Sequence, residues 1–471
     1  MQQWIKRTSV ASVIVSVLVG CGGGSNDSNG HTGGGTPPVK PSGDITAIAL
    51  REHLYPRNFT QALQVNMDYF IDGVGVSTLA NVPFDHIVMQ PNGHAASGYT
   101  NTTAIALYLN LLVEMHEAGD EKAVVRLEDV ITQLEQAPHW NGLFYWLYTL
   151  DGEKLTAPEN GVVSAVDNGN LSFSLAAVSG AFYDRPDTRL QQLAARVDTL
   201  LNKQVRGWSR LYDGQKGLLR AGWDRKTNNY LTYYVDRKAN ESRLAVIWAV
   251  LATQGSGTAV PSTAFTDMEV VTGEYNQNGE YFEPMLTWDG SYFQAMLPAL
   301  WLNERDLMPN YDMVEAFSEV HKRYADPLGI PFLTASATVD NGYRAFGVEA
   351  VSEGHRRYGH SIAQAPTGSP HALALYALVD EQDAIARLLA LKAAHPAVET
   401  SAGWVDAIDS QGRLSQKIIG IDQGMFVGAF LADEVRDNVT RYMARHGWEA
   451  TLATLYSHFV ADITLAADVD Q

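Results

Sequence analysis

The sequence has almost no cysteine and no concentration of basic residues, and it has no long apolar run after its first twenty positions. Cys21 is the only cysteine among 471 residues, so a disulfide framework within the chain is excluded. Lysine and arginine together number 34 against 53 aspartates and glutamates, and the basic residues form no patch. We therefore expect no nucleic-acid partner, and acidic or phosphorylated ligands are disfavoured.

Sequence signatures of several enzyme classes are also missing. The chain has no Gly-x-Ser-x-Gly nucleophile elbow, no P-loop and no dinucleotide-binding fingerprint, so acyl, phosphoryl and hydride transfer lack support. His355, His360 and His371 invite a zinc interpretation. However, His355 and His360 miss the i,i+4 spacing of a helical ligand pair, and no cysteine lies near them. We predict no metal and no cofactor.

The N-terminus has the pattern of an export signal. Lys6 and Arg7 precede an apolar stretch at 10–19 that is too short to span a bilayer. The Leu-Val-Gly-Cys sequence ending at Cys21 resembles a bacterial lipobox, and Gly22 is typical of lipoproteins sent to the outer membrane. We predict a lipoprotein signal at 1–21 with Cys21 acylated, and an ordinary secretory signal is the alternative.

The remaining chain divides into a tether and a body. Residues 22–43 are mostly glycine, serine, asparagine and proline, which predicts a flexible tether. Residues 44–471 are predicted to form one soluble catalytic domain. The protein is thus expected to be exported and anchored to the outer membrane, on its periplasmic side or at the cell surface. Contact with the membrane is expected only through Cys21.

Apolar residues recur at helical spacing in pairs of segments, which predicts an all-α fold of six helical hairpins. Connections within a pair are short, whereas those between pairs are long and rich in aromatic residues. Closing the hairpins in a toroid places the long loops and the inner helix N-termini on one face. A stack of helical pairs is the alternative. The predicted pairs are 102–118 with 122–134, 168–183 with 188–204, 241–254 with 262–272, 291–302 with 311–324, 370–379 with 381–394, and 422–434 with 435–446.

Two carboxylates stand out at predicted helix starts that are far apart in the chain. Glu241 and Asp422 each follow an aromatic loop and precede an apolar run of helical period. A toroid would bring both to one cleft, where an acid and a base could cleave a glycosidic bond. Asp422 is expected to stay ionised at its helix N-terminus and act as the base, and Glu241, beside Tyr233 and Tyr234, is expected to be the acid. The alternative roles are an N-cap for Asp422 and a solvated helical residue for Glu241.

Other residues are predicted to bind substrate. The 10 tryptophans and 21 tyrosines are abundant in predicted loops, where their flat rings suit sugar faces. Asp167 has an N-cap role as its alternative. The predicted substrate-binding residues are Tyr145, Asp167, Trp223, Arg243, Trp288, Asp289, Tyr358, His360, Trp404 and Gln423.

Five short segments resemble, in the same order, the glucoamylase-like enzymes that include bacterial endo-β-1,2-glucanases. They are NGLFY at 141–145, VSAVDNG at 163–169, NESR at 240–243, WDGSYF at 288–293 and GIDQG at 420–424. The resemblance implies an (α/α)6 barrel, hydrolysis of β-1,2-glucan, and an acid and a base at Glu241 and Asp422. It also implies that the acid acts through a hydroxyl of the bound sugar. One departure is Gln294, where the wider family often carries glutamate.

The favoured function is therefore an endo-acting, inverting glycoside hydrolase with a neutral β-glucan substrate, and the protein is expected to be a monomer. A polysaccharide lyase of similar helical fold and a surface glycan-binding lipoprotein without catalysis are the alternatives. A lyase would release unsaturated products, whereas a binding protein would leave its glycan uncut.

Overall fold

The computed structural model describes residues 55–362 and 366–467. The predicted signal, Cys21 and the tether at 22–43 lie outside the described residues. One main core of buried side chains extends from Phe59 to Phe459. The domain boundaries at 21 and 43 stay predictions. None of the described helices combines the length and the apolarity that crossing a bilayer requires.

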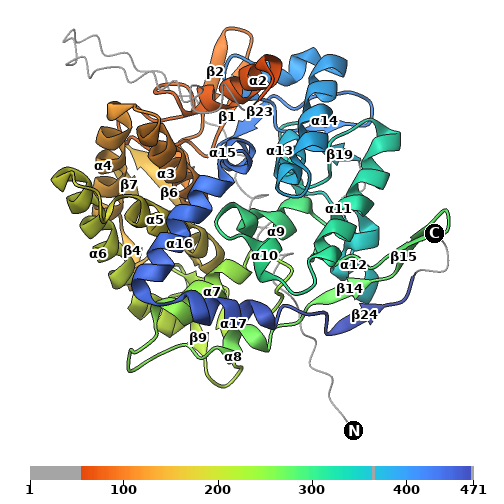
Figure 1. The fold of residues 1–471 in the computed structure, drawn as a ribbon. Coiled ribbons are helices and arrows are strands. Elements are labelled where there is room, and N and C mark those ends of the chain that lie inside the picture. Colours follow the sequence, from red (N-terminus) through yellow and green to blue (C-terminus); the bar gives the residue numbers. More distant parts are fainter. Residues whose placement is uncertain (1–54, 363–365, 468–471) are drawn as a thin grey trace.

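A group of largely buried helices forms the centre of the molecule (Figure 1). They are α3 (Thr102–Glu117), α5 (Ala165–Phe182), α7 (Arg243–Ala252), α9 (Tyr292–Met296) with its 3-10 extension η4 (Leu297–Leu300), α13 (Pro370–Leu375) and α15 (Gly420–Ala429). Every residue of α5 is buried, as expected for a helix with no charged face. Helix α5 packs between α3 and α7, and α15 packs on α3 and α13. Close approach depends on glycine, because a Cβ at Gly169 would lie 2.7 Å from the backbone nitrogen of Ala245.

A second set of helices is buried on one side only and covers the central ones. It contains α2 (Arg57–Met67), α4 (Glu121–Gln136), α6 (Thr188–Leu211), α11 (Asp312–Ala325), α14 (Glu381–Ala394), α16 (Ala432–His446) and α17 (Glu449–Ser457). In α6, buried residues such as Leu190, Leu193, Val197 and Leu201 recur at helical spacing. The short helices are α8 (Thr263–Thr266), α10 (Glu304–Leu307) and α12 (Glu353–Tyr358), and the other 3-10 turns are η3 (Asp68–Phe70), η5 (Asp326–Leu328), η6 (Glu349–Val351), η7 (Tyr376–Leu378) and η8 (Pro396–Val398).

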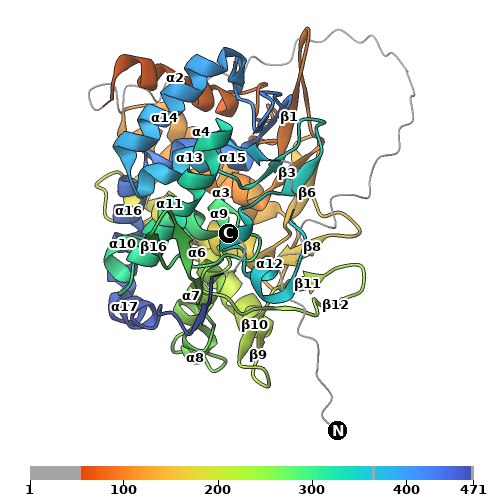
Figure 2. The same ribbon diagram turned by 90° about the vertical axis from the view of Figure 1, so that its right-hand side faces the viewer.

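Short strands form two- and three-stranded sheets in the long connections. Figure 2 shows β1, β3, β6, β8 and β11 together on one side of the molecule, with α14, α16 and α17 on the other. Strands β3, β8 and β23 lead directly into α3, α5 and α15, so these sheets mark the N-terminal ends of the central helices.

The strand bounds are as follows. They are β1 (His86–Gln90), β2 (Gly93–Ala96), β3 (Tyr99–Asn101), β4 (His139–Trp140), β5 (Leu143–Phe144), β6 (Leu147–Asp151), β7 (Lys154–Thr156), β8 (Val162–Ser164), β9 (Tyr212–Asp213), β10 (Leu218–Arg220), β11 (Gly222–Asp224), β12 (Asn229–Tyr230), β13 (Tyr234–Val235), β14 (Val271–Gly273), β15 (Tyr275–Gln277), β16 (Glu280–Phe282), β17 (Ala335–Ala337), β18 (Tyr343–Ala345), β19 (Thr367–Gly368), β20 (Glu399–Thr400), β21 (Gly403–Trp404), β22 (Ile408–Asp409), β23 (Lys417–Ile419) and β24 (Ile463–Leu465).

The all-α prediction is therefore only partly right. The predicted helix at 262–272 is wrong, because only the four residues of α8 are helical there and the chain then turns into β14. The last predicted pair breaks at 430–431 rather than after 434. Helix α16 also packs across α5 rather than only on its own partner, α15. Closure of the helices into a complete toroid stays a prediction.

Candidate functional site

A pocket of about 170 Å³ opens at the N-terminal ends of the central helices. Thr103 of α3, Asp167 of α5 and Gln294 of α9 line it, together with Glu241 just before α7 and Ile421 of α15. The predicted meeting of helix N-termini on one face is therefore confirmed for these helices. The remaining lining residues are Asp85, His86, Tyr99, Asn101, Trp146, Leu147, Val166, Asn170, Asp289, Phe293, Leu297, Ala335, Tyr343, Ala345, Lys417 and Ile419.

Glu241 is partly buried in the pocket wall, and its Oε2 atom has no hydrogen-bond partner among the described residues. Burial raises the pKa of the Glu241 carboxyl to about 7, and the nearby charges of Asp289 and Asp167 act in the same direction. The group therefore keeps its proton close to neutral pH. This is the state that a general acid needs before it donates to a leaving group.

Asp167 and Asp289 lie on the same pocket. The N-cap of α5 is Ser164, whose Oγ accepts the Asp167 backbone N–H at 3.3 Å, so the alternative role of Asp167 as N-cap is wrong. Instead, Asp167 Oδ1 accepts a hydrogen bond from Thr103 Oγ1 at 2.7 Å. Burial raises the pKa of Asp167 and of Asp289 to about 6 each.

Gln294 holds Asp289 in place. Its Nε2 donates to Asp289 Oδ2 at 3.3 Å, and its Oε1 accepts the Asp289 backbone N–H at 3.2 Å. Gly290 follows with a φ of 68°, and a Cβ there would lie 2.2 Å from the Val348 carbonyl oxygen. Glycine is therefore required at position 290 for this turn. The side-chain amide of Gln294 orients the Asp289 carboxylate and does not itself take the place of a catalytic acid.

Asp422 lies behind the pocket wall, contrary to the prediction that it faces the cleft. Asp422 is the third residue of α15 and is only 2% exposed. Its neighbours Ile419 and Ile421 line the pocket in its place. The expectation that the helix N-terminus keeps Asp422 ionised is also wrong, because burial and then the adjacent Asp406 raise its pKa well above the ordinary value. Ile419 is the residue at the N-cap position, and it makes no side-chain cap bond.

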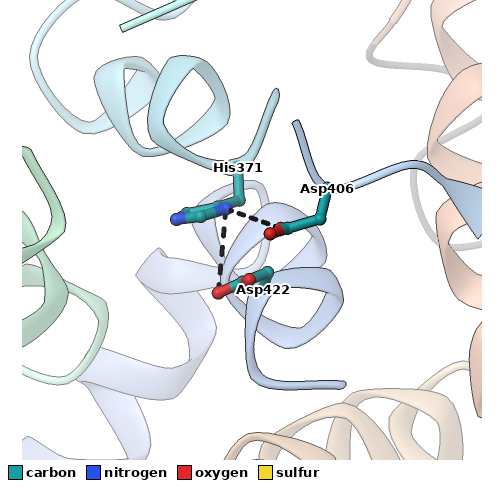
Figure 3. A group of neighbouring side chains, drawn as sticks. All are labelled: His371, Asp406 and Asp422. Atoms are coloured by element: carbon teal, nitrogen blue, oxygen red, sulfur yellow. Dashed lines mark ion pairs between the residues drawn. The ribbon is translucent and has the colours of Figure 1, made fainter. Parts of the chain in front are cut away.

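Three buried groups meet at this point (Figure 3). His371 Nδ1 lies 3.5 Å from Asp406 Oδ1 and 3.7 Å from Asp422 Oδ1. Ligand atoms from the three residues lie within 4.8 Å of one another, so their spacing is compatible with a metal ion. The absence of a metal stays a prediction. His355 and His360 are elsewhere, where His355 Nδ1 contacts the His360 carbonyl oxygen at 3.1 Å.

Tyr343 is influenced by both carboxylates that the sequence singles out. It lines the pocket, and after burial the charges that raise its pKa include those of Asp422, Asp406, Asp85 and Glu241. Its hydroxyl therefore stays protonated and lies within electrostatic reach of both Glu241 and Asp422. Sequence reasoning missed Tyr343 because it lies on a short strand, β18, without a periodic pattern.

Several residues predicted to bind substrate have structural roles instead. Arg243 is fully buried and donates to Glu304 Oε1 at 2.7 Å and Oε2 at 2.6 Å, so it cannot reach a sugar. Trp404 is also fully buried and packs on Phe426. Gln423 is buried and donates its Nε2 hydrogen to the Trp404 carbonyl oxygen at 3.0 Å. The substrate-binding predictions for these three residues are therefore wrong.

The other predicted aromatic residues lie outside the pocket lining. Trp288 is only 3% exposed and packs against the rings of Tyr358 and His360. Tyr145 is buried with Tyr148, and the next residue, Trp146, lines the pocket in its place.

Trp223 is half-buried and stacks on Trp140, with ring centroids 5.4 Å apart. Trp223 belongs to β11, which pairs with β8, the strand that leads into α5. Contact between substrate and Trp223, Tyr358 or His360 stays a prediction.

The pocket lining also contains residues that the sequence did not indicate. Asp85 immediately precedes β1 and His86 is its first residue. Tyr99 belongs to β3, and Lys417 belongs to β23. His86 Nδ1 lies 2.9 Å from Asp85 Oδ2. Among the lining residues Lys417 is the only lysine or arginine, against the four carboxylates Asp85, Asp167, Glu241 and Asp289.

No protein-family model matches the chain, and no curated protein matches its sequence. Solved structures do match its fold. An endo-β-1,2-glucanase from Talaromyces funiculosus, solved with β-1,2-glucan, aligns over 91% of this chain and 98% of its own at 12% identity with a TM-score of 0.73.

Two bacterial enzymes match as well. The endo-β-1,2-glucanase from Chitinophaga pinensis, solved with sophorotriose and glucose, covers 85% of this chain and 97% of its own at 17% identity, with a TM-score of 0.67. A β-1,2-glucanase from Parabacteroides distasonis aligns over 86% of this chain and 60% of its own at 14% identity, with a TM-score of 0.64. This chain has the fold of these enzymes. The resemblance found in the sequence is confirmed at the level of fold.

Proposed function

We propose that the protein is a glycoside hydrolase that cleaves β-1,2-glucan internally. The observation that carries the proposal is Glu241, which borders a pocket at the helix N-termini with one unpartnered oxygen and a pKa of about 7. The fold supports it, since several of the solved structures that match are named as β-1,2-glucanases, and one of them holds β-1,2-glucan.

Glu241 is proposed to act as the general acid. Its proton passes to the glycosidic oxygen, directly or through a hydroxyl of the bound sugar, as the bond between that oxygen and the anomeric carbon breaks. A water molecule forms the new bond to the anomeric carbon and gives up its proton to the base. Asp422 is the proposed base in its ionised form, which can accept this proton, and inversion of the anomeric carbon is the expected outcome.

A relay is needed because Asp422 lies behind the wall. Tyr343 lines the pocket and interacts electrostatically with both Asp422 and Glu241. A neutral hydroxyl accepts one proton while it donates another, so Tyr343 is proposed to pass the proton of the attacking water to Asp422. A hydroxyl of the bound sugar is the alternative relay.

The charge of the pocket favours a neutral substrate. Four lining carboxylates face a single lysine, which would repel the uronic acid groups that polysaccharide lyases process. Partly protonated carboxyls, by contrast, both donate to and accept from sugar hydroxyls. This favours a hydrolase of neutral glucan over the lyase alternative.

A panel of linear and cyclic glucans of different linkage tests the proposal, with products separated by chromatography. We expect a ladder of β-1,2-linked oligosaccharides with new reducing ends, since internal cleavage produces several lengths. A single short product would indicate exo action, and ultraviolet-absorbing products would indicate a lyase. Binding without cleavage would leave only the glycan-binding role.

We also propose that the protein is an exported monomer anchored to the outer membrane through Cys21. The support is the sequence pattern around Cys21, which lies outside the described residues. Cell fractionation of the wild type and of Cys21→Ser tests this. The wild type should be found with the outer membrane and the variant should be released, whereas identical fractionation would contradict the anchor.

A further inference from the structure

The cluster behind the pocket wall contains more titratable groups than the proposed reaction requires. Asp422 alone would serve as a base, yet Asp406 and His371 share its enclosure, and all three residues are at most 2% exposed. Asp422 Oδ2 has no hydrogen-bond partner among the described residues. Burial of three such groups together is costly unless their charges depend on one another.

The surroundings of Asp406 favour its ionised form. Its Oδ2 accepts the backbone N–H of Ala337 at 2.5 Å, and Ser369 Oγ lies 3.5 Å from its Oδ1. Although burial acts to raise the pKa of Asp406, hydrogen bonds from His371 and Asp422 outweigh it and lower that pKa. Two adjacent carboxylates cannot both ionise easily, so the ionised Asp406 drives a proton onto Asp422.

His371 has the opposite influence when its imidazole carries a proton. Its Nδ1 atom faces both carboxylates and also contacts Ser369 Oγ at 2.6 Å, while its Nε2 has no partner among the described residues. A proton on the imidazole places a positive charge beside Asp422 and therefore stabilises the ionised carboxylate.

We propose that Asp406 and His371 are positioning residues that set the protonation of Asp422, Asp406 favouring its protonated form and His371 its ionised form. The inference rests on the proposed function, in which Asp422 accepts a proton from the attacking water. The three groups then accept that proton as one unit, and the charge is spread over buried partners instead of resting on a single carboxylate.

Other titratable groups also face Asp422. Asp85, just before β1, raises its pKa further, and Tyr69 of η3 and Tyr343 of β18 interact with its charge. Lys417 of β23 interacts with Asp85 and Asp406. These groups are unchanged in the variants below, so they cancel in the comparison.

The pH dependence of kcat/KM on β-1,2-glucan in three variants tests the inference. Asp406→Asn keeps an acceptor for the Ala337 N–H but removes the charge, and should move the acidic limb to lower pH by about one unit or more. His371→Gln should move it to higher pH by a similar amount. Ser369→Ala, which removes a neutral partner of both groups, should leave the limb within a few tenths of a unit.

Opposite shifts support the inference, whereas lower rates with an unmoved limb in both variants would overturn it and leave a packing role. Divalent metal ions provide a further check. If zinc or manganese raises the activity and melting temperature of the wild type but not of His371→Gln, the cluster is a metal site and the inference fails.

A spectroscopic measurement separates this inference from the proposed function. The infrared carbonyl band of protonated Asp422, identified by its loss in Asp422→Asn, is followed against pH in the wild type and His371→Gln. The band should persist to higher pH in His371→Gln even if no glucan is cleaved. Unchanged midpoints would refute the coupling, and absent cleavage with shifted midpoints would refute only the proposed reaction.

Discussion

Glu241 and Asp422 carry the same functional group in two different surroundings. Glu241 borders the pocket, and its proton is retained mainly because of burial, with Asp289 and Asp167 adding to it. Asp422 lies behind the wall in contact with a second carboxyl and an imidazole. An acid has to reach the leaving oxygen, whereas a base reached through a relay can lie deeper. The difference teaches that placement, and not residue type, separates the two roles.

Removing the proton of Glu241 should have the largest effect on activity. Glu241→Gln should lower kcat on β-1,2-glucan by about 10²- to 10⁴-fold, because the amide cannot protonate a leaving group. Reducing-end release measures the rate, and thermal unfolding checks the fold. Asp433→Asn, at a highly exposed carboxylate, is the control. Retention of more than a tenth of the activity in Glu241→Gln would remove this residue from the chemistry.

The buried ion pair beside Glu241 should affect stability instead of binding. Arg243→Met leaves Glu304 buried without its ion-pair partner, and should lower the free energy of unfolding by about 3–5 kcal/mol. The exposed pair Arg305–Glu315 is the matched control, and Arg305→Met should cost under about 1 kcal/mol. Urea unfolding measures both. A large change in KM with unchanged stability in Arg243→Met would restore its predicted role in substrate binding.

The relay to Asp422 is tested by Tyr343→Phe. Loss of one hydroxyl should lower kcat by about tenfold, while the ring continues to fill the wall. Initial rates at saturating β-1,2-glucan provide the measurement, with Tyr99→Phe on the same pocket as a comparison. An unaffected kcat in Tyr343→Phe would leave the relay to a sugar hydroxyl.

The smallest expected effect concerns the alkaline limb of the pH dependence of kcat/KM. The kcat/KM of the wild type should fall above a pH of about 7 as Glu241 loses its proton. Because the charge of Asp289 helps to raise that pKa, Asp289→Asn should move the limb to lower pH by less than about one unit. A limb that moves upward in Asp289→Asn would show that another group is the acid.

Much of the helical framework was readable from the sequence. The apolar period located α3 to α6, and the position of Glu241, Asp167 and Asp289 at helix starts placed them on the pocket. Loop strands have no such period, so Tyr343 and Lys417 were missed. The pairing of Arg243 with Glu304, 61 residues further on, also has no local signal.

The error on Asp422 has a simple physical cause. Adjacent helical residues point in directions about 100° apart, so whether Ile421 or Asp422 faces the pocket depends on how α15 is rotated in the packed structure. A sequence locates the helix start but not this rotation. Asp406 lies in the loop between β21 and β22. It could not be found from the sequence either, because the cluster depends on tertiary packing.

The anomeric form of the first product, followed by proton NMR during cleavage of β-1,2-glucan, tests the central claim most directly. In the proposed reaction a water molecule attacks the anomeric carbon in a single displacement, so the account predicts that α-anomeric reducing ends appear first and then convert to the equilibrium mixture. Reducing ends that are β-anomeric at the earliest times, or the absence of any product, would contradict it.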